Sequence, residues 1–205
     1  MLRIIPADEL PFHPRLRAGM FRDRARQFRE RLGWDVPVDA AGWERDPYDA
    51  EGPLYVLWER PDGSHGGSAR FLPTLGRTMT EDHFLHLTGG VALKSPLIWE
   101  CTRFCLAPGS DPAEGARVGA LLMLGGAELM RRAALTHLLG VFDAPMTAVY
   151  RRLGAEPEVL GTAAGVSVGL WSESPRARDR LLRRAALTPE ALDAMLDGPA
   201  PALAA

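Results

Sequence analysis

Residues 96–106 read PLIWECTRFCL, and this stretch decides the fold. Its apolar and β-favouring content predicts a strand, bounded by Pro96 before it and by the sequence APG at 107–109 after it. A central strand covered on both faces is nearly continuous in apolar residues, yet Glu100 and Arg103 lie in the middle of this one. Charges at such positions must be paired or face a cleft. A buried ion pair, an exposed edge and a functional site are all consistent with the pattern.

The spacing of Glu100 and Arg103 leads to a further prediction. Residues three apart on a regular strand point to opposite faces of the sheet. If both side chains serve one site, the strand must contain a β-bulge, which is a common feature beside active sites. We therefore predict a bulge within this strand.

The length and composition of the chain favour one α/β domain. Its 205 residues can bury a sizeable core, and a net charge of -2 gives no electrostatic reason to expect nucleic acid. No early apolar run is long enough for a signal peptide or a membrane span, so we expect a cytoplasmic protein. Cys101 and Cys105 would lie about 13 Å apart on one strand, too far for a disulfide. No partner residue has the spacing of zinc ligands, so we expect no metal site.

The predicted elements form a single αβα sandwich around a mixed sheet. Strands are expected at 1–5, 54–59, 67–72, 96–106, 138–143, 159–160 and 166–171, and helices at 14–32, 112–136, 145–153 and from 174 and 188 onward. We expect residues 1–197 to form one domain and residues 198–205 to be a disordered tail.

The first predicted helix points an arginine inward. Leu16, Met20, Phe28 and Leu32 form one apolar stripe, and Arg24 lies on that same stripe. Arg24 therefore faces either a cleft or the edge of the core, where its stem can pack while its head reaches water.

A loop and the start of a helix also contain candidate functional residues. The segment 34–52 has no clear period, and its run ERDPYD at 44–49 suits either a functional loop or a solvated one. Before the helix at 112, Asp111 is expected to cap and Glu114 to complete a capping box. The small residues at 115–120 suit a pyrophosphate at the helix start or, equally, close helix packing.

Four motifs then occur in a fixed order: R-x3-F-x3-L-x-W at 24–34, E-x-D-x-Y-D at 44–49, R-x-L-P-T at 70–74 and W-E-x2-R-F at 99–104. Together they resemble the bacterial acyl-homoserine-lactone synthases of quorum sensing. The match covers about half of the chain, and residues 107–173 are compatible with that family without a sharp motif. The resemblance implies a sheet related to that of the GCN5-type N-acetyltransferases.

The resemblance also implies the reaction. The substrates would be S-adenosylmethionine and an acyl thioester, carried by acyl carrier protein or by coenzyme A. The products would be an N-acyl homoserine lactone and methylthioadenosine, and no cofactor is implied because S-adenosylmethionine is a substrate. By analogy, the cleft consists of Arg24, Phe28, Trp34, Asp46, Asp49, Arg70, Glu100, Arg103 and Phe104.

The residue types suit the charges of S-adenosylmethionine. Asp46 and Asp49 can hold its cationic groups, and Trp34 can stack near the sulfonium. Arg24 or Arg103 can pair with its carboxylate in a bidentate manner.

Acylation requires a base and an oxyanion site. Glu100 is the expected base for the amine, directly or through one water. Backbone amides exposed by the bulge near Phe104 would bind the tetrahedral oxyanion. Lactone closure would depend on positioning rather than on a protein nucleophile.

The acyl chain is expected between the central strand and the next one. The candidates for its pocket, which could equally be simple core residues, are Phe104, Met123, Phe142, Met146 and Val149. Family members that prefer 3-oxo chains resemble one another in a threonine on the strand equivalent to 138–143, and LLGVFD contains none. This favours an unsubstituted and short, branched or aryl acyl group. The arginine pairs 131–132 and 151–152 suit either an acidic carrier protein or solvent.

Two other functions are compatible with the sequence. A GCN5-like N-acyltransferase acting on another amine would not need Asp46, Asp49 and Trp34 together. A non-catalytic ligand-binding relative is disfavoured by the intact Glu100 and arginine set. The oligomeric state is not indicated by the sequence.

Overall fold

The computed structural model describes residues 1–197, so the tail expected at 198–205 lies outside the described residues. One mixed sheet has the strand order β6-β7-β5-β4-β3-β2-β1-β8. The strands are β1 (Leu2–Pro6), β2 (Leu54–Glu59), β3 (His65–Pro73), β4 (Ile98–Leu106), β5 (His137–Asp143), β6 (Glu158–Ala163), β7 (Val166–Ser172) and β8 (Leu196–Asp197). The helices are α1 (Pro14–Arg24), α2 (Met79–His83), α3 (Pro112–Arg132), α4 (Met146–Leu153), α5 (Pro175–Ala185) and α6 (Pro189–Met195).

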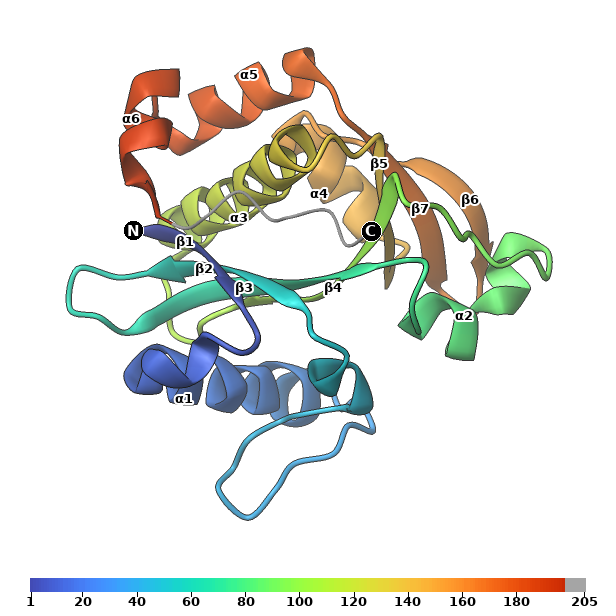
Figure 1. Ribbon diagram of the computed structural model, residues 1–205, viewed down its shortest axis with the longest axis horizontal. Helices are drawn as coiled ribbons and strands as arrows, with labels where there is room; N and C mark the ends of the chain where they lie inside the picture. Colours follow the sequence, from blue (N-terminus) through green and yellow to red (C-terminus); the bar gives the residue numbers. More distant parts are fainter. Residues whose placement is uncertain (198–205) are drawn as a thin grey trace.

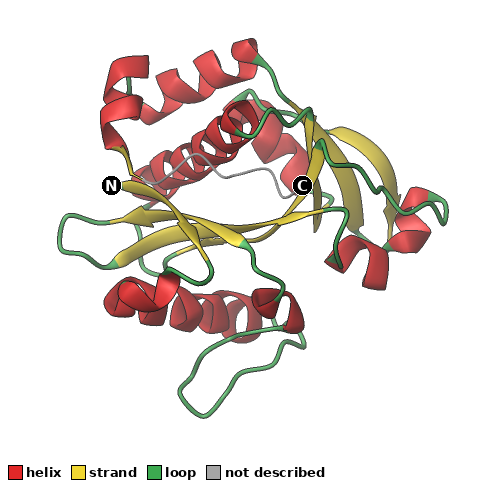
Figure 2. Ribbon diagram, viewed as in Figure 1, coloured by secondary structure: helices red, strands yellow, loops and turns green. Residues whose placement is uncertain are grey.

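Helices cover both faces of the sheet, which confirms the predicted αβα sandwich (Figures 1 and 2). Helix α1 lies under one face, and α3, α4 and α5 lie over the other. Helix α3 approaches the sheet closely at Gly125, where an added Cβ would lie 2.3 Å from Cγ1 of Val56. A side chain at position 125 would therefore push α3 away from the sheet.

The predicted first helix has two parts. The α-helix ends at Arg24, and a π-helical segment, Ala25–Arg31, continues it to Gly33, whose φ is 68°. Inserted π-helical turns occur frequently at functional sites. Here the segment contains Phe28, one of the predicted site residues.

Strand β4 contains the predicted bulge. Arg70 pairs with Thr102 and Ser68 pairs with Cys105, so two residues of β4, Arg103 and Phe104, lie opposite one residue of β3. Arg103 adopts a left-handed conformation with φ of 52°. The extra residue turns the Arg103 side chain to the face of the sheet from which Arg70 projects.

Strands β4 and β5 separate at the same point. Their parallel pairing extends only from Ile98 with His137 to Cys101 with Gly140. Beyond it, the two strands diverge, and β5, β7 and β6 turn away from the other strands (Figure 1). The opening lies directly beside the bulge.

Some local predictions differ from the structure. Helix α3 ends at Arg132 rather than at 136, and Ala134 adopts a positive φ of 49°. Asp111 caps α3 as expected, but Glu114 pairs with Arg60 at 2.9 Å instead of completing a capping box. Short strand β8 was not predicted because two residues carry no detectable periodicity. No helix within residues 1–197 is long and apolar enough to cross a membrane.

Candidate active site

Three arginines and three acids meet on the α1 side of the sheet. This ionic cluster consists of Arg24 from α1, Arg70 from β3, Arg103 from β4, and Glu44, Asp46 and Asp49 from the loop between α1 and β2. None of the six side chains is more than 10% exposed. Three positive and three negative charges can be buried together because each charge has an oppositely charged partner.

Arg24 joins the first helix to the acidic loop. Its Nη1 and Nη2 donate to the two carboxylate oxygens of Asp49, each at 2.9 Å, and its Nε donates to Glu44 at 2.6 Å. Burial opposes ionisation of Asp49, but Arg24 and Arg70 outweigh burial and hold the pKa of Asp49 well below its usual range. The inward orientation of Arg24 predicted from the helical stripe is confirmed by its 1% exposure.

Arg103 is held by two acids of the same loop. Its Nη2 lies 2.7 Å from Asp46, and its Nε donates to Glu44 at 3.0 Å. Glu44 therefore bridges Arg24 and Arg103, although the sequence analysis assigned it no role. The signal for Glu44 was its place in the ERDPYD run, at the start of the same motif as the two aspartates.

Asp46 and Asp49 face arginines rather than open space. Arg70 binds both oxygens of Asp46 and also contacts Asp49 at 2.9 Å. Asp49 further accepts hydrogen bonds from the Tyr55 hydroxyl at 2.8 Å and from the backbone of Asp46 at 3.0 Å. In this structure the two aspartates therefore hold the arginines in place, and direct contact with a cationic ligand stays a prediction.

Glu100 is fully buried beside the cluster. Its carboxylate oxygens accept hydrogen bonds from the backbone N–H of Met79 at 3.0 Å and of Thr80 at 2.7 Å, the first residues of α2. The Sδ atom of Met79 lies 3.6 Å from Nη1 of Arg103. Glu100 and Arg103 thus contact the same residue, Met79, and the bulge brings the two side chains close to each other.

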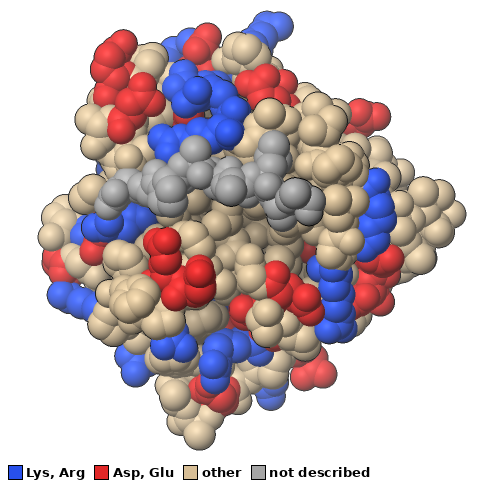
Figure 3. Space-filling view, viewed as in Figure 1, with Lys and Arg blue, Asp and Glu red and all other residues tan. Residues whose placement is uncertain are grey.

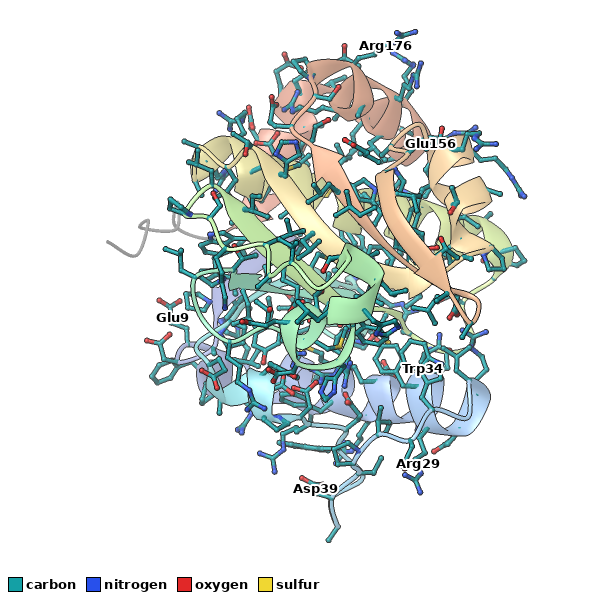
Figure 4. All side chains as sticks on the ribbon, turned by 90° about the vertical axis from the view of Figure 1, so that its right-hand side faces the viewer. Glu9, Arg29, Trp34, Asp39, Glu156 and Arg176 are labelled. Carbon is teal, nitrogen blue, oxygen red and sulfur yellow. The ribbon has the colours of Figure 1, made fainter. Side chains whose placement is uncertain are left out.

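An aromatic pair lies next to Arg103. Phe28 and Trp34 stack with ring centroids 5.0 Å apart and an interplanar angle of 6°, and the Arg103 guanidinium lies 5.5 Å from the centre of the Phe28 ring. Trp34 is 40% exposed, and Figure 4 shows it above the helix that contains Phe28. An exposed indole face next to a buried charge cluster can receive a planar or cationic ligand.

A cavity of about 300 Å³ lies on the other side of β4, where β4 and β5 diverge. Phe104 and Met123, two of the residues proposed from the sequence for the acyl pocket, belong to its lining. The apolar part of its wall also includes Phe71, Cys101, Leu122, Gly126, Ala127, Met130, Leu138, Gly140, Val141, Tyr150, Trp171 and Leu181. Arg103 and Phe104 belong to this wall as well, so the bulge separates the cavity from the ionic cluster.

Three predicted pocket residues lie outside this lining. Phe142 packs edge-to-face behind Tyr150 and Trp171, with ring centroids 5.3 and 5.4 Å apart. Met146 is half-buried on α4, and Val149 on the same helix is 36% exposed. The positions of these three residues in the sequence suggested that they line the acyl pocket. The orientation of α4 instead directs Met146 and Val149 away from the cavity.

The environment of the two cysteines disfavours a nucleophilic role. Burial raises the pKa of both thiols to about 12, which disfavours the reactive thiolate at neutral pH. Among residues 1–197, no group of three or more His, Cys, Asp or Glu side chains is arranged to hold a metal ion. Acidic and basic side chains are interspersed over the face shown in Figure 3.

Known proteins share this chain's sequence and fold. Residues 11–169 match the family described as autoinducer synthase. The acyl-homoserine-lactone synthase of Rhizobium etli is 42% identical over 178 residues, which are 83% of this chain and 84% of the relative. The synthase of Ralstonia nicotianae is 33% identical over 149 residues, 70% of this chain and 73% of the relative. The crystal structure of the AHL synthase LasI superposes with a TM-score of 0.77 at 27% identity, covering 88% of this chain and 93% of LasI.

Proposed function

The chain belongs to the autoinducer synthase family, and we propose how its ionic cluster and cavity produce an N-acyl homoserine lactone. It is an acyltransferase of quorum sensing, with S-adenosylmethionine and an acyl thioester as substrates and methylthioadenosine as the second product. One observation carries the proposal: the bulge at 103–104 contacts the charged cluster on one face of β4 and the apolar cavity on the other. The amine of S-adenosylmethionine, bound at the ionic cluster, and the thioester carbonyl, bound at the cavity, can react only at a point of β4 that both substrates reach.

The geometry supports Arg103 as the partner of the S-adenosylmethionine carboxylate. The sequence left both Arg24 and Arg103 as candidates for this role. Arg24 is only 1% exposed, and its Nε, Nη1 and Nη2 atoms all donate to acids of the cluster. Arg103 is the most exposed arginine of the cluster, at 10%. It also lies beside the Phe28–Trp34 pair, whose faces suit the sulfonium and the adenine.

In the proposed division of roles, Asp46, Asp49, Arg24 and Arg70 shape the binding site. Asp46 and Glu44 hold Arg103 in its left-handed conformation, and Arg70 and Arg24 fix the two aspartates. Such a neutral, fully paired cluster is pre-organised, so little reorganisation accompanies substrate binding.

The acylation step follows from this arrangement. Glu100 takes a proton from the substrate ammonium, directly or through one water, since each carboxylate oxygen keeps a second lone pair. The free amine attacks the thioester carbonyl, and the amides of Arg103 and Phe104 at the bulge face the developing oxyanion. The carrier thiolate leaves and receives a proton, which yields the acylated amine.

Lactone closure needs no further protein nucleophile. The substrate carboxylate, held near its own γ-carbon, forms the ring C–O bond while the C–S bond breaks and methylthioadenosine leaves as a neutral thioether. The same step neutralises the positive charge of the sulfonium and the negative charge of the carboxylate. Because both reacting groups already belong to one molecule, the protein contributes by holding the carboxylate and the γ-carbon in an attack geometry.

The cavity supports an acyl group of moderate length. Its volume is about 300 Å³, and its wall is mostly apolar. Thr102 is the threonine in the lining, and it lies on β4 rather than on β5. The absence of threonine from β5 supports an acyl chain without a 3-oxo group. Both substrates are cytoplasmic metabolites, which supports a cytoplasmic reaction.

The test is incubation with S-adenosylmethionine and a panel of acyl thioesters on coenzyme A and on acyl carrier protein. We expect mass spectrometry to detect an acyl homoserine lactone and methylthioadenosine in equal amounts, and the ratio of kcat/KM values to identify the donor. Arg103→Lys serves as the control, since an ammonium cannot pair with Asp46, Glu44 and a carboxylate at once. If titration calorimetry shows no binding of S-adenosylmethionine, an N-acyltransferase of another amine is the better assignment.

A further inference from the structure

Helix α2 is attached to the rest of the site at both of its ends. We propose that Tyr48 and Asp82 are positioning residues for Arg103, and that Glu100 positions the same guanidinium through the start of α2. The inference rests on the proposed function, because it concerns the arginine assigned to the S-adenosylmethionine carboxylate.

The start of α2 is held by Glu100. The Met79 and Thr80 amides that donate to Glu100 are free donors of the first helical turn, which a carboxylate satisfies well. Thr78 caps the same turn by accepting a hydrogen bond from the backbone of Glu81 at 3.3 Å. A buried carboxylate with two backbone donors is a rigid attachment, because releasing it would leave a charge without partners.

The end of α2 is held by the loop that carries the acids of the ionic cluster. The Tyr48 hydroxyl donates to Asp82 at 2.8 Å, and Nε of Arg77 donates to the same carboxylate oxygen at 2.7 Å. The guanidinium groups of Arg77 and Arg70 lie 5.1 and 5.5 Å from the centre of the Tyr48 ring. Tyr48 is 3% exposed, so its ring and hydroxyl are held in one place.

A third contact secures the middle of α2. Lys94, the only lysine in the chain, pairs with Glu81 and donates to the carbonyl of Gly76 at 2.6 Å. Both partners of the Lys94–Glu81 pair are 35% exposed, so this contact contributes less than the buried ones. The short helix thus keeps its place through side chains of β4, the acidic loop and the segment before β4.

These attachments fix the position of Met79. Its backbone is fixed by Glu100, and its thioether contacts Nη1, the arginine nitrogen that neither Glu44 nor Asp46 engages. Met79 therefore limits where Nη1 of Arg103 points. If α2 shifts, Arg103 keeps its acids but loses the contact that directs its free edge, and the substrate carboxylate loses an aligned partner.

The experiment compares Tyr48→Phe and Asp82→Ala, alone and combined. Each single change removes the hydroxyl–carboxylate bond and leaves the ionic cluster intact, and Asp82→Ala also removes the bond from Arg77. We expect KM for S-adenosylmethionine to rise about tenfold and KM for the acyl thioester to change less than twofold. The double variant should raise this KM no further than Asp82→Ala alone, because Tyr48→Phe removes only a bond that Asp82→Ala already removes. Asp62→Ala, which alters an exposed acid in the turn before β3, is the control and should change neither KM.

A second readout needs no substrate. With ¹³C-methyl-labelled methionine, the Met79 signal should shift in Tyr48→Phe, Asp82→Ala and Glu100→Gln and stay in place in Asp62→Ala. Parallel rises of both KM values, or an unshifted Met79 signal, would overturn the proposal. If the wild-type protein makes no lactone, the proposed function fails, while the Met79 signal still decides whether α2 is held as described. A Glu100→Gln variant with low kcat and an unshifted Met79 signal would assign Glu100 to proton transfer alone.

Discussion

Arg24 and Asp49 form a two-pronged ion pair, with both N–O distances at 2.9 Å, across 25 residues of sequence. The pair ties the end of α1 to the 3₁₀ turn Pro47–Ala50 of the acidic loop. Because both side chains are at most 8% exposed, solvent cannot replace either partner. The loop therefore adopts its functional shape as part of folding rather than on substrate binding.

Asp49→Asn should leave the buried ionic cluster with three arginines and only two acids. We expect a loss of about 3 kcal/mol in the free energy of unfolding, because Glu44 and Asp46 cannot compensate all three buried positive charges. Urea unfolding followed by circular dichroism measures it. The control is Glu156→Gln, which breaks the exposed pair with Arg151 and should cost about 1 kcal/mol at most. Equal losses in the two variants would show that burial of the cluster is not decisive.

Trp34→Ala should weaken binding of S-adenosylmethionine with little effect on stability. The indole is 40% exposed and stacks on Phe28, so it offers a free face next to Arg103. We expect the dissociation constant, measured by calorimetry, to rise about tenfold, in line with a desolvated cation–π contact of roughly 1–2 kcal/mol. Phe12→Ala is the control, since Phe12 is an aromatic ring that is 81% exposed and lies outside the lining of both cavities. Comparable losses of affinity in both variants would contradict the role of Trp34.

Met123→Trp should shift acyl preference toward shorter chains. Met123 lines the 300 Å³ cavity, so a larger ring there removes space for the distal methylenes. We expect the ratio of kcat/KM for octanoyl over butanoyl thioesters to fall by about tenfold or more, since one methylene is worth about 1–3 kcal/mol in a fitted pocket. Met146→Trp, on α4 outside the lining, should leave this ratio unchanged. The opposite pattern would move the acyl site toward α4.

His65→Gln should reduce the sensitivity of the fold to mild acid. His65 is 2% exposed and contacts Asp23 at 2.8 Å, and burial lowers its pKa despite the opposing effect of Asp23. Because the folded-state pKa lies below the unfolded value of about 6.5, the unfolded chain binds the proton first. The stabilising contribution is thus complete above that value and is lost as the pH falls below it. Urea unfolding at pH 7.5 and 5 should show a smaller decrease for the variant, and equal decreases would refute this.

The main features of β4 followed from the local pattern. A strand with an acid and a base three residues apart requires a bulge if both serve one face, and the bulge is present at Arg103. The stripe that placed Arg24 inward held because Leu16, Met20 and Arg24 all lie in the regular α-helical part, before the π-helical segment begins. The mixed αβα sandwich is confirmed because apolar periods specify the layers. The expected relation to GCN5-type folds came from the family resemblance and not from periodicity.

The partners of the charged residues did not follow from any pattern. Glu44 bridges two arginines that lie 20 and 59 residues away. Glu100 binds two backbone amides of the five-residue helix α2, which is too short for periodicity to locate its first turn. The orientation of α4 placed Met146 and Val149 outside the cavity, although their position after β5 suggested its wall.

Periodicity, caps and breakers act over a few residues, so the sequence alone established the strands, the inward arginine, the bulge and the family motifs. Which acid meets which arginine depends on loops closing over tens of residues, and many pairings of the same six charges are equally compatible with the local pattern. Only the folded chain selects among them, because burial makes an unpaired charge too costly and leaves one arrangement in which all six are satisfied. The same selection places Met79 on Arg103 and so joins α2 to the site.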